Sequence, residues 1–230
     1  MKTIGIIGGM SWESSKFYYE YINRIVADQL AGSHSAKILM SSVDFSEIET
    51  LSFEENWEQI GKLMAIEAKK LETAGADVVI LATNTIHIVA GHIEKEISVP
   101  FLHIAHATGE AIQKKNVHKI ALLGTRFTME KDFYTQILTH DFGLKVLIPS
   151  EDERTYLQNL IYGELVKGQF TQEGKEKCLH IIDNLKFQGA EGVILGCTEL
   201  PILIPEEEIS IVSFDTTMIH SLAAVDFATS

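Results

Sequence analysis

A segment that occurs twice is the feature that most constrains the fold of this 230-residue chain. Residues 75–85 read GADVVILATNT, and residues 189–199 read GAEGVILGCTE, at an offset of 114 residues (189 − 75). Two further pairs of apolar runs occur in the same order in both halves: residues 4–10 with 120–126 before this segment, and residues 97–103 with 209–215 after it. Apolar runs ending in glycine are common in α/β proteins, so one pair alone would indicate little. Three ordered pairs indicate an internal duplication of one α/β unit.

Short apolar runs alternate with longer amphipathic stretches along the whole sequence. The runs predict strands at 3–7, 37–44, 77–82, 99–103, 118–123, 144–148, 191–195 and 210–214. The stretches predict helices at 13–30, 54–74, 86–95, 105–115, 130–140, 151–167 and 172–188. Strands that alternate with helices imply parallel sheets with right-handed crossovers. We therefore expect an α/β protein with two pseudo-symmetric domains, each a parallel sheet flanked by helices.

The expected domains divide the chain into two similar halves. The first comprises residues 1–98 with a closing segment at about 213–230, and the second comprises residues 99–212. No Pro-, Gly- or Ser-rich linker marks the boundary. Two related strand ends, each with a proton-bearing side chain at Thr83 or Cys197, predict an active-site cleft between the halves.

The composition excludes several kinds of partner. The net charge is −13 and no basic cluster occurs, which argues against nucleic acid or an anionic membrane. No segment approaches the ~18 consecutive apolar residues of a membrane helix. With only two cysteines, we expect no disulfide scaffold and a reducing, cytoplasmic location.

Polar side chains follow the predicted strands at the ends where α/β proteins bind ligands. Free backbone N–H groups and hydroxyls at such points can bind a carboxylate, although Asn and Thr also cap helices there. The candidate binding residues at these strand ends are Met10, Ser11, Asn84, Thr85, Thr125, Thr198 and Glu199.

Cys197 is the strongest single candidate for chemistry. A cysteine in a turn after a glycine can be exposed near positive backbone dipoles, which would lower its pKa toward the thiolate. The alternative is a small buried hydrophobic residue, the role we expect for Cys178 in its amphipathic helix. Glu199 and Asp215 could tune Cys197, orient a substrate or cap helices.

Other motifs indicate less. The GIIGG turn at residues 5–9 lacks the GxGxxG spacing of a dinucleotide site. We expect four histidines to be surface or hydrogen-bonded residues rather than metal ligands, because no acids or cysteines cluster with them: His87, His92, His103 and His106. No Walker A or catalytic-triad signature occurs.

Taken together, the motifs resemble the cofactor-independent aspartate/glutamate racemases of the Asp/Glu/hydantoin racemase superfamily, across essentially the whole chain. The motifs are GGMSWES at 8–14, SVDF at 42–45, TNTIH at 83–87, LGTRFT at 123–128, IY and KG at 161–168, and GCTE at 196–199. The resemblance implies two pseudo-symmetric α/β domains facing one cleft, a homodimer, an amino-acid substrate and no pyridoxal phosphate. Family members use one cysteine per domain as acid and base on opposite faces of the α-carbon.

The sequence departs from this pattern where Thr83 stands in place of the first cysteine. It is similar in this to the bacterial racemases specific for L-aspartate and L-glutamate. The resemblance implies that Cys197 deprotonates the L-enantiomer, that the Thr83 side reprotonates the other face, and that Lys167 pairs with the substrate's side-chain carboxylate. Two alternatives remain: a single-cysteine decarboxylase of a small diacid, and a non-catalytic amino-acid-binding protein.

Overall fold

Eight apolar runs of the sequence form eight strands in the computed structural model, which describes residues 1–230. The strands are β1 (Thr3–Gly8), β2 (Lys37–Ser42), β3 (Val78–Leu81), β4 (Phe101–Leu102), β5 (Lys119–Gly124), β6 (Lys145–Leu147), β7 (Gly192–Gly196) and β8 (Val212–Asp215). They form two parallel four-stranded sheets, ordered β2-β1-β3-β4 and β6-β5-β7-β8. The two orders are the same when the strands are numbered within each half. The predicted fold class, parallel sheets flanked by helices, is confirmed.

The chain forms two compact units, one around each sheet. Unit 1 comprises Met1–Ile104 and Thr217–Ser230, and unit 2 comprises Ala105–Thr216. These boundaries lie a few residues beyond the expected ones at 98 and 212. Strand pairing is the reason, because β4 pairs with β3 in unit 1 and β8 pairs with β7 in unit 2.

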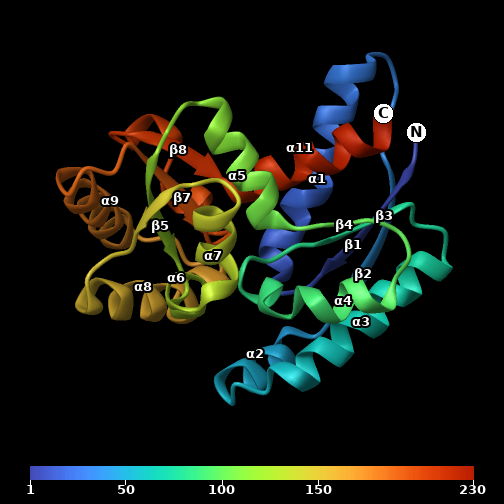
Figure 1. Cartoon of the computed structure of the whole chain (residues 1–230), viewed down its shortest axis with the longest axis horizontal. Coiled ribbons are helices and arrows are strands. Elements are labelled where there is room, and N and C mark those ends of the chain that lie inside the picture. The colour runs from blue at the N-terminus through green and yellow to red at the C-terminus, as the bar shows by residue number, and fades with distance from the viewer. The chain divides into compact units, whose positions relative to one another are not determined.

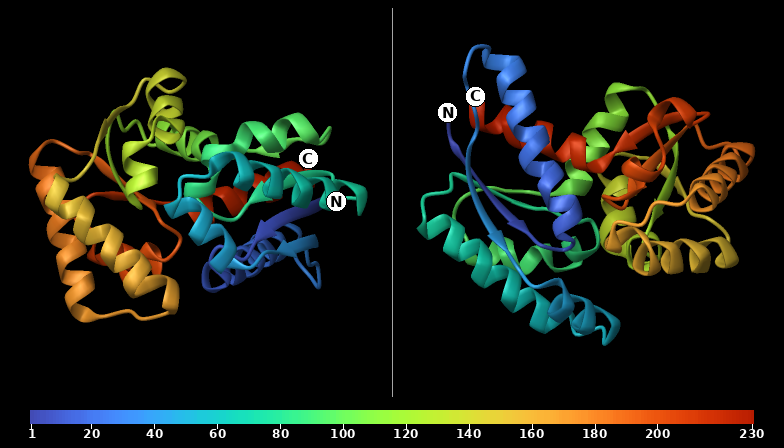
Figure 2. Two further views of the ribbon diagram at one scale, coloured as in Figure 1. Left: turned by 90° about the horizontal axis from the view of Figure 1, so that it is seen from below. Right: turned by 180° about the vertical axis from the view of Figure 1, so that it is seen from behind.

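Helices cover the sheet of unit 1 on both faces (Figures 1 and 2). Its helical elements are α1 (Trp12–Leu30), α2 (Phe45–Phe53), α3 (Trp57–Thr73), η1 (Thr85–Val89), α4 (Ala90–Glu96) and α11 (Thr216–Thr229). The alternation of side chains along β3 separates two cores. Val78 and Ile80 pack with residues of α1 and α11, whereas Val79 and Leu81 pack with residues of α3 and α4.

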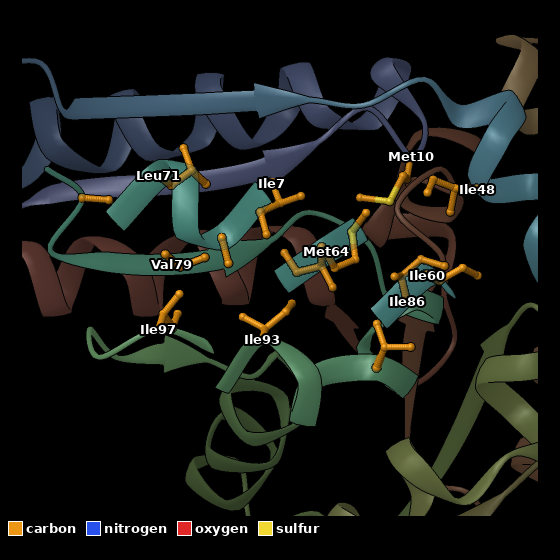
Figure 3. Close-up of a cluster of buried hydrophobic side chains, with 14 residues drawn as sticks. Ile7, Met10, Ile48, Ile60, Met64, Leu71, Val79, Ile86, Ile93 and Ile97 are labelled. Carbon is orange, nitrogen blue, oxygen red and sulfur yellow. The ribbon is translucent and has the colours of Figure 1, made fainter. Parts of the chain in front are cut away.

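The second of these cores shows how a sequence pattern becomes a packed layer. Asn56 begins α3 by accepting a hydrogen bond from the backbone of Gln59 at 3.2 Å. The buried residues of this helix recur at three- and four-residue spacing and form one face, which includes Ile60, Met64, Ala68 and Leu71. Figure 3 shows Ile60, Met64 and Leu71 in one cluster with side chains of β1, β3, η1 and α4 and with Met10.

Unit 2 repeats the alternation of strands and helices. Its helical elements are α5 (Ile104–Lys114), α6 (Arg126–Glu130), α7 (Asp132–His140), α8 (Glu151–Gly163), η2 (Leu165–Lys167), α9 (Gln172–Phe187), α10 (Leu200–Leu203) and η3 (Glu206–Glu208). The expected helix at 151–167 is wrong in its last turn, because α8 ends at Gly163 and a separate 3₁₀ turn follows. The sequence interpretation also missed α2, α6, α10 and α11.

Candidate active site

Thr83 and Cys197 occupy corresponding places in the two units. Thr83 comes two residues after Leu81, the last residue of β3, and Cys197 comes directly after Gly196, the last residue of β7. The strands β3 and β7 hold the same position in their sheets. Both residues therefore lie just beyond a carboxyl edge of a parallel sheet, where α/β proteins bind ligands.

In unit 1, strand pairing brings five predicted site residues to one edge. Ile7 of β1 is in register with Leu81 of β3, and the backbone N–H of Ala82 donates to the Ile7 carbonyl at 2.8 Å. The segments that follow the two strands carry the five residues, all of them buried: Met10, Ser11, Thr83, Asn84 and Thr85. The Met10 side chain belongs to the hydrophobic cluster of Figure 3, so its predicted substrate contact remains a prediction.

The turn after β1 is fixed by a glycine and a serine. Gly9 has φ +97°, and a Cβ atom there would lie 2.3 Å from the Val43 carbonyl oxygen. The Gly9 N–H donates to Ser15 Oγ at 2.8 Å, and this hydroxyl donates to the Ser11 carbonyl at 2.7 Å. The backbone at Ser11 is thereby held against the first turn of α1.

In unit 2, the paired ends of β5 and β7 bring Thr125 and Cys197 to one edge. Gly124 and Gly196 are in register, and the two site residues directly follow them. Thr125 accepts a hydrogen bond from the backbone of Thr128 at 3.2 Å and so caps α6. Its predicted substrate contact remains a prediction beside this capping role.

Cys197 is buried beside a carboxylate. Its side chain is 6% exposed, and Sγ donates to Oε2 of Glu199 at 3.1 Å. Burial, and after it the charge of Glu199, raises the pKa of the Cys197 thiol well above its ordinary value. The expected exposed thiol with a lowered pKa is therefore wrong. The backbone N–H of Glu199 acts in the lowering direction but is the weaker influence.

Glu199 is the centre of a small buried hydrogen-bond group. The same Oε2 atom accepts from the Thr198 hydroxyl at 2.9 Å. The Glu199 side chain makes no capping bond to α10, so the helix-capping interpretation is wrong for this residue. Its carboxylate instead contacts the thiol of Cys197 directly.

The remaining predicted residues lie elsewhere. Lys167 is exposed at the end of η2, and its side chain makes no hydrogen bond or ion pair. Cys178 is buried in α9, where burial raises the pKa of its thiol to about 12. This confirms the expected role of Cys178 as a small hydrophobic residue.

His87 is a neighbour of Thr83 whose position the sequence did not reveal. It is 1% exposed, and its ring Nδ1 lies 2.7 Å from the Thr83 carbonyl oxygen. The interpretation as a hydrogen-bonded histidine is confirmed. Its spacing of four residues from Thr83 is the one signal that could have indicated the contact. No group of three or more His, Cys, Asp or Glu side chains is arranged to hold a metal ion.

Fold and site define an α/β protein with a thiol and a hydroxyl at corresponding strand ends of two similar units. The family profile of the Asp/Glu/hydantoin racemases matches residues 7–224. The chain belongs to this family, and hence to the amino-acid racemase class of isomerases. No helix of the structure has the length and apolar character needed to cross a membrane.

Known relatives and solved structures agree with this assignment. The chain is 25% identical over 173 residues to the broad specificity amino-acid racemase RacX of Bacillus subtilis, covering 74% of each chain. It is similar to the structure of a candidate Asp/Glu racemase from Yersinia pestis, with 44% identity, a TM-score of 0.93 and full coverage of both chains. An aspartate racemase homologue from Pyrococcus horikoshii is 36% identical with a TM-score of 0.86, again over both whole chains.

Proposed function

We propose that this protein racemises L-aspartate and L-glutamate without a cofactor, with Cys197 as the base toward the L-enantiomer and the Thr83 side as the proton donor. The observation that supports it most is the corresponding position of Thr83 and Cys197 after β3 and β7. Inversion at an α-carbon needs one group to remove a proton from one face and another to supply a proton to the opposite face. Two like strand ends with unlike side chains fit this division of roles.

Glu199 gives Cys197 a route to the thiolate. In the resting pair the thiol proton points to the Glu199 carboxylate. Transfer of this proton gives a thiolate and a neutral carboxylic acid, so no net charge is created in a buried place. The thiolate then takes the α-proton while the electron pair of the broken C–H bond stays on the substrate carbon. A thiol with a raised pKa yields a more strongly basic thiolate, which favours removal of a weakly acidic proton.

Thr83 is better suited to deliver a proton than to remove one. Its hydroxyl is too weakly acidic to be a resting base at neutral pH, yet it can deliver a proton to a carbanion that forms beside it, directly or through water. The hydroxyl then regains a proton from solvent, and Glu199 returns its proton to solvent. The reverse reaction would need Thr83 as the base, so turnover of D-enantiomers should be very slow.

The acidic substrates are supported by the names of the relatives and by one cationic candidate. The similar proteins from Yersinia pestis and Pyrococcus horikoshii are described as an Asp/Glu racemase candidate and an aspartate racemase homologue. Lys167 offers an unpaired ammonium group in unit 2 for a side-chain carboxylate. The predicted homodimer and cytoplasmic location remain predictions.

Incubation of the purified protein with L-aspartate or L-glutamate in D₂O tests this function. Proton NMR follows loss of the α-hydrogen, and chiral chromatography identifies the product enantiomer. We expect deuterated D-product with the native protein and neither exchange nor inversion with Cys197→Ser. Cys178→Ser is the matched control and should keep both activities. Absence of both activities from the native protein would refute the racemase assignment for these substrates.

A further inference from the structure

Two buried histidines of unit 1 contact the backbone just beyond β3 and at the end of β4. His87 is in η1 after β3, and His220 is in α11, with ring centroids 5.8 Å apart. His220 bridges the Tyr18 hydroxyl, 3.2 Å from its Nδ1, and the Leu102 carbonyl, 2.8 Å from its Nε2. His87 bridges two backbone groups, one of which belongs to Thr83.

The partners of His87 determine which ring nitrogen carries its proton. The backbone N–H of Ile104 donates to Nε2 at 3.2 Å, so Nε2 must be the acceptor. Nδ1 faces the carbonyl oxygen of Thr83 at 2.7 Å, so Nδ1 must carry the hydrogen. Burial, together with the neighbouring His103 and His220, lowers the pKa of His87 well below its ordinary value and keeps the ring neutral.

This bond completes the fixation of the backbone at Thr83. The Thr83 N–H donates to the Leu81 carbonyl at 2.9 Å, and the Thr83 carbonyl accepts from His87. The His87 N–H in turn donates to the Asn84 carbonyl at 3.1 Å, which closes the turn on itself. Because the direction of the Cα–Cβ bond follows from the backbone, these bonds together set the position of Thr83 Cβ, from which the hydroxyl projects.

The ring also ties this turn to the end of β4. Ile104 comes two residues after Leu102, which is in register with Ile80 of β3. The His87 ring packs between this segment and the turn, 5.6 Å from the Phe101 ring and 4.6 Å from the His103 ring by centroids. Thr83 is therefore fixed to two neighbouring strand ends of the same sheet rather than to its own strand alone.

We propose that His87 is a positioning residue for the reprotonation step, in which its Nδ1–H bond to the Thr83 carbonyl holds the Thr83 hydroxyl in line for proton delivery. The proposal rests on the proposed racemase function. His87 touches no reacting atom, since both its ring nitrogens are engaged by the backbone. Its loss should therefore affect inversion and spare the removal of the α-proton by Cys197.

Two substitutions of His87 distinguish its hydrogen bond to the Thr83 carbonyl from its hydrogen bond to the Ile104 N–H. In His87→Asn the side-chain amide can take the place of Nδ1–H and still donate to Thr83. In His87→Gln the longer side chain can place its carbonyl oxygen near the Nε2 position and still accept from Ile104, but the donor to Thr83 is lost. His220→Gln is the matched control, at a buried histidine of the same unit that hydrogen-bonds to Tyr18 and Leu102 and not to Thr83.

The measured quantity is the rate of D-product formation divided by the rate of α-hydrogen exchange into L-glutamate in D₂O. We expect this ratio to fall about tenfold or more in His87→Gln, because small displacements of a reacting group carry large rate penalties. It should stay near the native value in His87→Asn and in His220→Gln. An unchanged ratio in His87→Gln, or an equal fall in the Asn and Gln variants, would overturn the positioning role.

Failure of the two proposals can be told apart. If the native protein racemises and His87→Gln keeps the native ratio of D-product formation to α-hydrogen exchange, only the positioning role of His87 is refuted. If the native protein shows neither exchange nor inversion, the racemase function is refuted and the His87 role with it.

Long-range proton–nitrogen NMR of the native protein gives a second test that needs no variant. It should show His87 protonated at Nδ1, and protonation at Nε2 would contradict the proposal.

Discussion

The thiol of Cys197 donates a hydrogen bond to the carboxylate of Glu199, with 3.1 Å between Sγ and Oε2 and both side chains buried. Cys197 is thus a neutral thiol in the resting protein, next to a carboxylate that can accept its proton. Burial and the negative charge of Glu199 both oppose ionisation of the thiol, and the second of these effects disappears when Glu199 itself accepts the proton. Thr198 adds a second donor to the same carboxylate oxygen and fixes its orientation.

Replacement of Glu199 by Gln should make the Cys197 thiol more acidic and yet slow the exchange of the substrate α-hydrogen. The pKa of Cys197 should fall, because the carboxylate charge that raises it is gone. Exchange of the α-hydrogen should fall roughly 100-fold, because the proton acceptor is lost. Ultraviolet titration of the thiolate in a Cys178→Ala background reports the first effect, and D₂O exchange reports the second. An unchanged pKa together with native exchange would contradict the coupling of the two residues.

A cysteine at position 83 should open the reverse reaction. Thr83→Cys places a group that can ionise where the hydroxyl cannot, so D-aspartate and D-glutamate should become substrates. Thr83→Ser is the matched control and should keep the preference for L-enantiomers. Chiral chromatography after incubation with each D-enantiomer measures the gain. No D-turnover in the cysteine variant would refute the proposed division of roles.

Lys167→Ala should raise the KM for L-aspartate and L-glutamate about tenfold, while kcat changes less. The ammonium group is exposed and unpaired in the structure and is proposed to pair with the side-chain carboxylate of the substrate. A hydrogen bond to a charged group contributes about 1.5–3 kcal/mol, which is consistent with a change of this size. Lys177→Ala, an exposed lysine of α9, is the control. Equal KM values for the two variants would show that Lys167 does not bind the substrate.

The stability of the protein should depend on His220 at acid pH. Burial lowers the pKa of His220 from its ordinary value of 6.5 to about 4, so the unfolded state binds a proton more readily than the folded state. This contribution to stability is complete above about pH 6.5 and is lost as the pH falls toward 4. It amounts to about 3 kcal/mol across that range. Urea unfolding at pH 7 and pH 4 should show a smaller difference for His220→Gln than for the native protein, and an equal difference would contradict the prediction.

Two glycines with nearly the same backbone conformation should differ in their tolerance of alanine. Gly9 has φ +97° and Gly75 has φ +101°, but only at Gly9 would a Cβ atom collide with backbone, 2.3 Å from the Val43 carbonyl oxygen. Gly75→Ala should cost about 1–2 kcal/mol for the backbone conformation alone. Gly9→Ala should cost on the order of 4 kcal/mol, because overpacking of about 1–3 kcal/mol adds to the same backbone strain. Thermal or urea unfolding of both variants measures the difference, and equal losses would show that the turn after β1 can move aside.

Regular elements of this chain were predictable where one pattern decided them. All eight strands lie where apolar runs predicted them. The reason is plainest for the central strands β1, β3, β5 and β7, because a strand buried on both faces needs such a run. The helix α11 was missed because it has no polar face to give it a period. Ala224, Val225 and Ala228 pack into the core with α1, while Thr216, His220 and Ser221 are buried as well. Its helical state follows from the packing around it.

The sequence by itself determined the duplication, the eight strands and the places of Thr83 and Cys197 after the corresponding strands, because strand periodicity and strand ends are local properties of the chain. Only the tertiary structure decided the state of those residues. The acidity of Cys197 depends on burial and on where the Glu199 carboxylate points. The fixation of Thr83 depends on a histidine ring that also reaches Ile104, 17 residues further along the chain than His87. Solvent exclusion and contacts between distant segments set the pKa of Cys197 and the position of Thr83, and the spacing of residues along the chain predicts neither.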